Sequence, residues 1–116
     1  MNVNESEDRI QAAIVTWYNN TYCLRHHNPR CLILSIPNGG TRHVQEAMTL
    51  KATGLLPGAS DLIVVHMGVL LWVEVKTETG RQSPEQRDFE QRVMSMGYRY
   101  ALVRSLENFK ELVASL

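Results

Sequence analysis

The feature that most constrains the fold of this chain is residues 60–76, where two strand-sized apolar runs flank the dipeptide Met67-Gly68. Apolar runs rich in β-branched residues on either side of a Gly-containing turn predict an antiparallel β-hairpin. If Met67 and Gly68 form a two-residue turn, His66 faces Val69, and the register of every later pair follows. A four-residue loop would give the same pairing.

That register places Asp61 directly opposite Glu74 on one face of the predicted sheet. The Cβ atoms of opposed residues lie roughly 4.5–5.5 Å apart, and two carboxylates at that distance are destabilising unless a cation lies between them. Lys76 follows Glu74 by two residues and therefore projects from the same face. The arrangement indicates a metal site; the simpler alternative is that all three are solvated charges at strand ends.

Both faces of the hairpin are apolar, so the sheet needs cover on two sides. We therefore predict an α/β fold with a mixed central β-sheet flanked by helices, in the order αβαββαβα. In chain order the expected elements are a helix over 5–20, a buried strand over 31–36, a helix over 42–53, the hairpin, a helix from Ser83 to Gly97, a strand over 98–103 and a final helix capped by Ser105.

Two helix starts carry specific signals. Ser83-Pro84 followed by Gln86 predicts a capping box, with Phe89, Val93 and Met96 as the buried stripe of that helix. In the first helix, Glu7 has a purely structural interpretation, either as a capping-box acid or as an acid favoured by the helix N-terminus.

The chain has 116 residues, which predicts a single domain over 1–116. Its 12 basic and 12 acidic residues give no net charge, so it is not expected to hold nucleic acid through an overall positive field. The N-terminus lacks the pattern of a signal peptide, and no apolar run is long enough to span a membrane. We therefore expect a cytoplasmic protein, not a secreted or membrane one, with reduced cysteines.

The Gly-rich turn that starts at Pro37 is a candidate phosphate-binding element. Backbone amides of Asn38, Gly39 and Gly40, together with Arg42, could hold a DNA phosphate. The alternative is that the glycines only serve the turn. The spacing differs from that of a P-loop or a dinucleotide fingerprint, so we expect no nucleotide cofactor.

Cys23, His26, His27 and Cys31 raise the alternative of a zinc site. Neither a CxxC nor an HxxxH spacing is present, and we favour a variable surface loop.

The spacing of Asp61, Glu74 and Lys76 resembles the D…ExK signature of the PD-(D/E)xK nucleases, with Ser60 where many members have proline. Further motifs narrow the resemblance to the VRR-NUC family, the virus-type replication-repair nucleases, and specifically to its stand-alone phage and bacterial members. These motifs are Glu7-x-x-Ile10-Gln11, Pro37-Asn38-Gly39-Gly40, Gly54-x-x-Pro57-Gly58-x-x-Asp61-Leu62, Glu74-x-Lys76 and Gly80-x-x-Ser83-x-x-Gln86. The resemblance implies a restriction-endonuclease-like core.

The resemblance also implies a role for individual residues. Asp61, Glu74 and the carbonyl of Val75 would bind Mg²⁺ or Mn²⁺, and Glu7 would be an additional acid near the metal. Hard carboxylate oxygens are consistent with Mg²⁺.

Two further roles concern the reaction itself. Lys76 would position and help activate the attacking water, and Gln86 would hold Lys76 or the scissile phosphate.

The first functional hypothesis is a metal-dependent, structure-specific DNA endonuclease that cuts branched DNA such as Holliday junctions. The alternatives are a catalytically silent DNA-binding or dimerisation module on the same fold, and a restriction-type nuclease. Symmetric cleavage of a two-fold junction suggests a homodimer. Tyr18 with Tyr22, or Met48 with Leu50, could supply its interface.

Overall fold

The computed structural model describes residues 6–23, 30–37 and 52–116. Their elements are α1 (Glu7–Tyr18), the π-helical turn η1 (Asn19–Cys23), β1 (Cys31–Ser35), β2 (Leu62–His66), β3 (Val69–Val75), α3 (Pro84–Ser95), β4 (Arg99–Val103) and α4 (Leu106–Ala114). The strands form one sheet in the order β1-β2-β3-β4; the first two pairings are antiparallel and β3–β4 is parallel. The predicted mixed α/β architecture is confirmed, with the hairpin at its centre.

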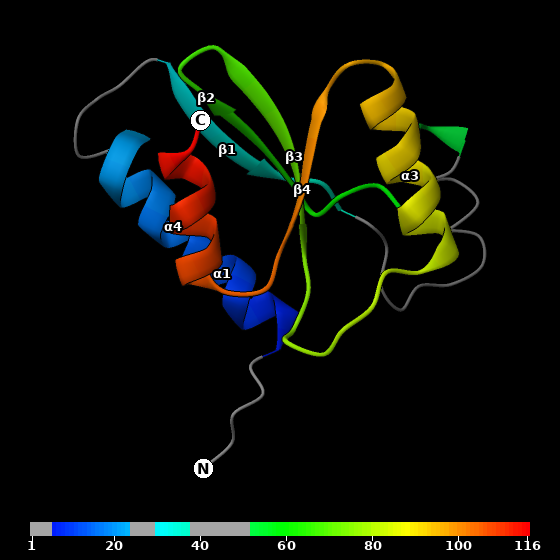
Figure 1. Cartoon of the computed structure of the whole chain (residues 1–116), viewed down its shortest axis with the longest axis horizontal. Helices are drawn as coiled ribbons and strands as arrows, with labels where there is room; N and C mark the ends of the chain where they lie inside the picture. Colours follow the sequence, from blue (N-terminus) through cyan, green and yellow to red (C-terminus); the bar gives the residue numbers. More distant parts are fainter. Residues whose placement is uncertain (1–5, 24–29, 38–51) are drawn as a thin grey trace.

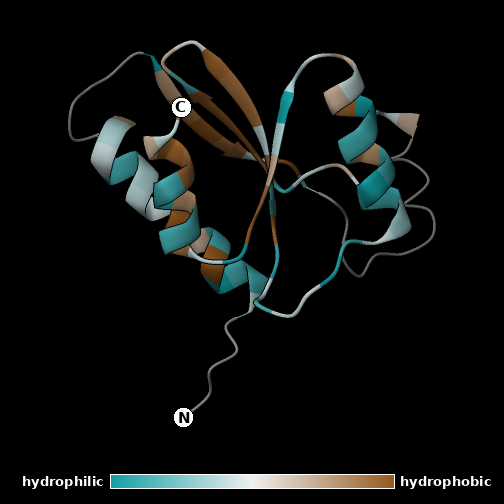
Figure 2. Ribbon diagram, in the orientation of Figure 1, coloured by the Kyte–Doolittle hydropathy of each residue, from teal (hydrophilic) through white to brown (hydrophobic). Residues whose placement is uncertain are grey.

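The helices cover the sheet in two layers. α1 and α4 lie side by side against one face, and α3 lies on the opposite side (Figure 1). The larger core forms between the sheet and the α1/α4 layer, and a smaller cluster of Ala59, Phe89 and Val93 forms under α3. Most of β2 and β3 is hydrophobic, and most of α3 is hydrophilic (Figure 2).

The hairpin has the predicted register. His66 pairs with Val69, and Leu62 pairs with Val73. Met67 and Gly68 both have positive φ, 50° and 90°, which is the conformation of a type I′ two-residue turn. The turn thus sets which side chains share a face.

β1 is an edge strand, and only alternate residues of it are buried. Cys31 and Ile33 face the α1/α4 layer, whereas Leu32 is 54% exposed and Leu34 is 40% exposed. The prediction of a buried strand is therefore wrong for one of its two faces.

The first helix is shorter than the predicted 5–20. Ser6 is its N-cap, and the Ser6 hydroxyl accepts a hydrogen bond from the Arg9 amide at 3.2 Å. Because the N3 position is then Arg9, Glu7 is not a capping-box acid. It lies in the first turn, where a negative charge interacts favourably with the helix dipole.

Tyr18, at the end of α1, is fully buried. Its hydroxyl donates to the carbonyl of Val65 at 3.2 Å and lies 2.9 Å from Nδ1 of His66. Burial raises the pKa of Tyr18 and lowers that of His66, so both groups are neutral. Tyr22 packs partly buried against the same core. Tyr18 is therefore not available for a dimer face, whereas a role of the partly buried Tyr22 in such a face stays a prediction.

α3 begins with the predicted capping box and buries Phe89 and Val93. Met96 is 65% exposed, so its predicted place in the buried stripe is wrong: the helix ends at Ser95, and Gly97 turns the chain with φ +89°. Ser105 caps α4 as predicted, and Phe109 and Val113 are buried.

The predicted helix over 42–53, with Met48 and Leu50, falls almost entirely outside the described residues. Within the described ranges, none of the helices combines the length and the apolarity that a membrane crossing requires.

Candidate active site

Asp61 and Glu74 meet where β2 begins and β3 approaches its end. Continuing the β2–β3 register by one residue past Leu62 and Val73 places Asp61 opposite Glu74. The backbone N–H of Val75 donates to Oδ2 of Asp61 at 2.7 Å. In an extended strand the N–H and the carbonyl of one residue point to the same side, so the Val75 carbonyl also points toward the Asp61 strand.

Glu74 is 1% exposed. Its Oε2 accepts a hydrogen bond from Nε2 of Gln86 at 3.0 Å, while its Oε1 is buried and has no hydrogen-bond partner among the described residues. Burial, together with the charge of Asp61 and a hydrogen bond to it, raises the pKa of Glu74 to about 8, and Lys76 only partly offsets this shift. The carboxyl group therefore lies where only a proton or a cation satisfies it.

Lys76 is 7% exposed, and its Nζ lies 3.9 Å from Oε2 of Glu7 at the start of α1. Glu7 also contributes to raising the pKa of Glu74, so its charge acts at the site. No group of three or more His, Cys, Asp or Glu side chains converges in a metal-binding geometry within the described part of the chain. In this structure Glu7 pairs with the lysine, and its role as an acid near the metal stays a prediction.

Gln86 serves the helix and the site together. Its Oε1 accepts from the Ser83 amide at 2.8 Å, which completes the capping box, and its Nε2 donates to Glu74. The family resemblance implied Lys76 or the scissile phosphate as the partner of Gln86; its observed partner is Glu74, and a contact with the phosphate stays a prediction. The two ends of one amide thus tie the start of α3 to the buried acid.

Gly58 allows the segment that leads to Asp61 to approach α3. It has φ +86°, and a Cβ at this position would collide with the carbonyl group of Glu85 and lie 2.9 Å from the Gln86 amide nitrogen. Only glycine permits both the backbone conformation and this contact.

Three residues near the acid pair were not identified from the sequence. Gln82 Nε2 donates to Oε1 of Glu90 at 3.0 Å and to the hydroxyl of Tyr100 at 3.1 Å. Burial and the charges of Glu74, Glu90 and Asp61 raise the pKa of Tyr100. Tyr100 pairs with Trp72 on the neighbouring parallel strand, and the sequence holds no signal for that pairing.

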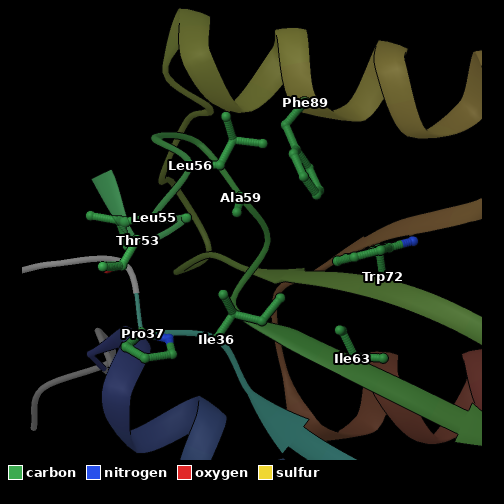
Figure 3. A pocket seen from close by; sticks show the side chains of 10 residues that line it. Ile36, Pro37, Thr53, Leu55, Leu56, Ala59, Ile63, Trp72 and Phe89 are labelled. Carbon is green, nitrogen blue, oxygen red and sulfur yellow. The ribbon is translucent and has the colours of Figure 1, made fainter. Parts of the chain in front are cut away.

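An apolar cavity of about 510 Å³ lies between α3 and the sheet (Figure 3). The rings of Trp72 and Phe89 meet edge to face across 5.3 Å, and Ala59 and Ile63 come from either side of Asp61. No carboxylate is among the described residues that line it, so the cavity is separate from the acid site. The lining residues are Ile36, Pro37, Thr53, Gly54, Leu55, Leu56, Ala59, Ile63, Trp72 and Phe89.

The structure does not describe the predicted phosphate-binding turn or the two histidines of the alternative zinc site. Asn38, Gly39, Gly40 and Arg42 lie outside the described residues, as do His26 and His27.

The two cysteines are described. Both are free thiols, and Sγ of Cys23 donates to the carbonyl of Cys31 at 3.3 Å.

Comparison with known proteins bears on the fold. A solved structure described as a "VRR_NUC domain protein" superposes with a TM-score of 0.73 at 19% identity, covering 96% of this chain and 87% of that chain. A second solved structure, described as a "VRR_NUC domain", superposes with a TM-score of 0.63 at 21% identity, covering 95% of this chain and 97% of that chain. A comparison with curated proteins finds no match.

Sequence identities this low do not assign a family, but a match to a family model does. The VRR-NUC domain model matches residues 5–107, a range that contains Glu7, Asp61, Glu74, Lys76 and Gln86. The chain therefore belongs to the VRR-NUC domain family and has its nuclease-type fold.

Proposed function

We propose that this chain is a metal-dependent, structure-specific DNA endonuclease that hydrolyses phosphodiester bonds in branched DNA such as Holliday junctions. The observation that carries the proposal is the buried Glu74 opposite the partly buried Asp61, with one unpartnered Glu74 oxygen and the charge of Lys76 acting on Glu74. A buried acid that faces a second acid destabilises the metal-free fold, and such an arrangement is typical of sites that bind a cation.

The residues present fit Mg²⁺ or Mn²⁺. Asp61, Glu74 and the carbonyl of Val75 would hold the ion, and all three offer the hard oxygen ligands that these cations prefer. When bound, such an ion lowers the pKa of a water molecule and offsets charge on the phosphate.

The residues of this chain then have separate tasks. Gln86 holds Oε2 of Glu74, which leaves Oε1 to face the site. Lys76 brings a positive charge, and 9% of its side chain is exposed. Its ammonium would position and help activate the attacking water. Glu7 would set the direction of that ammonium from the opposite side.

Cleavage of a panel of DNA structures tests this proposal. Labelled duplex, flap, splayed and four-way DNAs are incubated with Mg²⁺, with Mn²⁺ or with chelator. We expect metal-dependent cutting with a preference for branched substrates, and loss of cutting in Asp61→Asn. Asp88→Asn is the matched control, because Asp88 is an exposed acid on α3 that pairs only with Arg92 among the described residues. Undiminished cutting by Asp61→Asn would refute the site, and binding of branched DNA without cutting under any metal would indicate a silent binding module.

We also propose that the active unit is a homodimer, because two symmetric nicks on a two-fold junction are most simply made by two symmetric sites. Light scattering across a dilution series, run beside the junction assay, tests this. A monomer at every concentration that still makes paired symmetric nicks would contradict it.

A further inference from the structure

Arg104 lies between β4 and α4, and its guanidinium holds the loop that follows Lys76. One nitrogen, Nη1, donates to the carbonyls of Thr77 at 2.7 Å, Gly80 at 2.7 Å and Glu78 at 3.2 Å. Three carbonyls of a four-residue segment thus share a single donor nitrogen. Charge-assisted hydrogen bonds of this kind are among the stronger ones in proteins.

The loop held in this way connects two parts of the acid site. It begins directly after Lys76 and ends at Ser83, the N-cap of the helix that carries Gln86. Its own backbone supplies one turn bond, from the Gly80 amide to the carbonyl of Thr77 at 3.2 Å. A Cβ on Gly80 would lie 3.5 Å from Cδ of Lys76, so the turn packs against the lysine stem.

Arg104 is itself fixed at its backbone. Its N–H donates to Oδ1 of Asn108 at 3.0 Å, and the Asn108 amide donates to the hydroxyl of Ser105 at 3.0 Å. The preceding residue, Val103, accepts the Lys76 amide at 3.0 Å. The backbone of Arg104 is therefore held in place, and it lies next to the strand residue that pairs with Lys76.

We propose that Arg104 is a positioning residue for Lys76: by holding the 77–80 turn through three carbonyls, it sets where the Lys76 ammonium lies relative to Asp61 and Glu74. The proposal rests on the proposed nuclease function for its kinetic consequence. The three carbonyls that accept from Nη1 all belong to residues 77–80, so this nitrogen serves the turn.

Removing the guanidinium leaves the turn with its single backbone bond, and Lys76 then samples more than one direction. Small displacements of a catalytic group reduce rates strongly, so Arg104→Ala is expected to lower the single-turnover cleavage rate by roughly 10- to 100-fold. Binding of DNA should change less than about twofold, because the Nη1 donor contacts protein carbonyls and the substitution acts through the position of Lys76. Arg104→Lys keeps the charge but has a different donor geometry, and we expect an intermediate loss.

The experiment compares Arg104→Ala and Arg104→Lys with Arg99→Ala, which removes the same charge from the exposed start of β4. Each variant is measured for single-turnover rate, for DNA affinity and for hydrogen exchange of the amides in 77–82. The expected result is slower cleavage with retained affinity, and exchange at Gly80 at least about 10-fold faster than in wild type, confined to the Arg104 variants.

Two results would overturn the proposal. One is Arg104→Ala cleaving within twofold of Arg99→Ala; the other is a loss of DNA affinity that accounts for the whole loss of rate. If wild-type protein cuts no DNA at all, the nuclease proposal fails on its own. Exchange in 77–82 then decides the Arg104 contact separately: faster exchange in the Arg104 variants supports it, and unchanged exchange refutes it.

Discussion

Replacing Glu74 by glutamine should remove the fall in stability that this acid causes in the metal-free protein as the pH rises from 5 to 8. In wild type, burial and the facing Asp61 raise the pKa of Glu74 from 4.5 to about 8. The folded protein therefore keeps the proton on Glu74 over this pH range. In the unfolded chain the same carboxyl loses its proton above its ordinary pKa. Glutamine has nearly the same shape, has no proton to lose, and can still accept the hydrogen bond from Gln86.

The sign and size of the effect follow from proton linkage. The stability that the protonated Glu74 confers is fully present below pH 4.5 and is lost as the pH rises through about 8. Each pH unit between these limits lowers the free energy of unfolding by up to about 1.4 kcal/mol. The total approaches about 5 kcal/mol, a large part of the stability of a small domain.

Thermal unfolding in the presence of chelator, at pH 5, 6, 7 and 8, measures this. The quantity to compare is the Tm of wild type minus that of Glu74→Gln, because the pH dependence from the buried His66 is common to both proteins. We expect this difference to fall by about 10 °C or more from pH 5 to pH 8. Adding Mn²⁺ at pH 8 should raise the Tm of wild type much more than that of the variant. Parallel curves for the two proteins would refute the raised pKa of the buried Glu74.

Three further variants test other parts of the account. Lys76→Ala should lower the single-turnover rate by roughly 10²-fold with little change in DNA affinity, and the reverse pattern would make Lys76 only a phosphate contact. Gln86→Glu keeps the acceptor for the capping box but places a further acid against Glu74. It should destabilise the metal-free protein by about 1–3 kcal/mol at pH 8 and by less at pH 5. An equal loss of stability at both pH values would limit the role of Gln86 to helix capping. Gly58→Ala should lower the free energy of unfolding, measured in urea, by at least about 2 kcal/mol, because the positive φ of Gly58 and its contact with Glu85 both exclude a side chain. A change under about 0.5 kcal/mol would contradict the close approach of Gly58 to the Glu85 backbone.

The hairpin and its acid pair could be predicted because their signals are local. Met67 and Gly68 supply the turn, the period of two assigns side chains to faces, and the register then places Asp61 opposite Glu74 without knowledge of the remaining fold. The capping box of α3 was predictable for the same reason, since Ser83 lies only three residues from Gln86.

Contacts between distant elements were not predictable in this way. Tyr18 is buried in the core and hydrogen-bonds to His66, a residue 48 positions later, and nothing around Tyr18 in the sequence indicates that partner. The partner of the Gln86 amide depends on how α3 packs against the sheet, and the three carbonyls bound by Arg104 depend on how β4 pairs with β3. An exposed Met96 follows from the exact end of a helix, which apolar periodicity does not determine.

The most direct test of the acid pair as a metal site is an anomalous-scattering measurement on crystals of the wild-type protein grown with Mn²⁺. We expect an ion bound by carboxylate oxygens of Asp61 and Glu74 and by the carbonyl of Val75. The same crystals of Glu74→Gln should lose the ion or bind it much more weakly. An ion bound elsewhere, or one equally occupied in the variant, would contradict the assignment of this acid pair as the metal site.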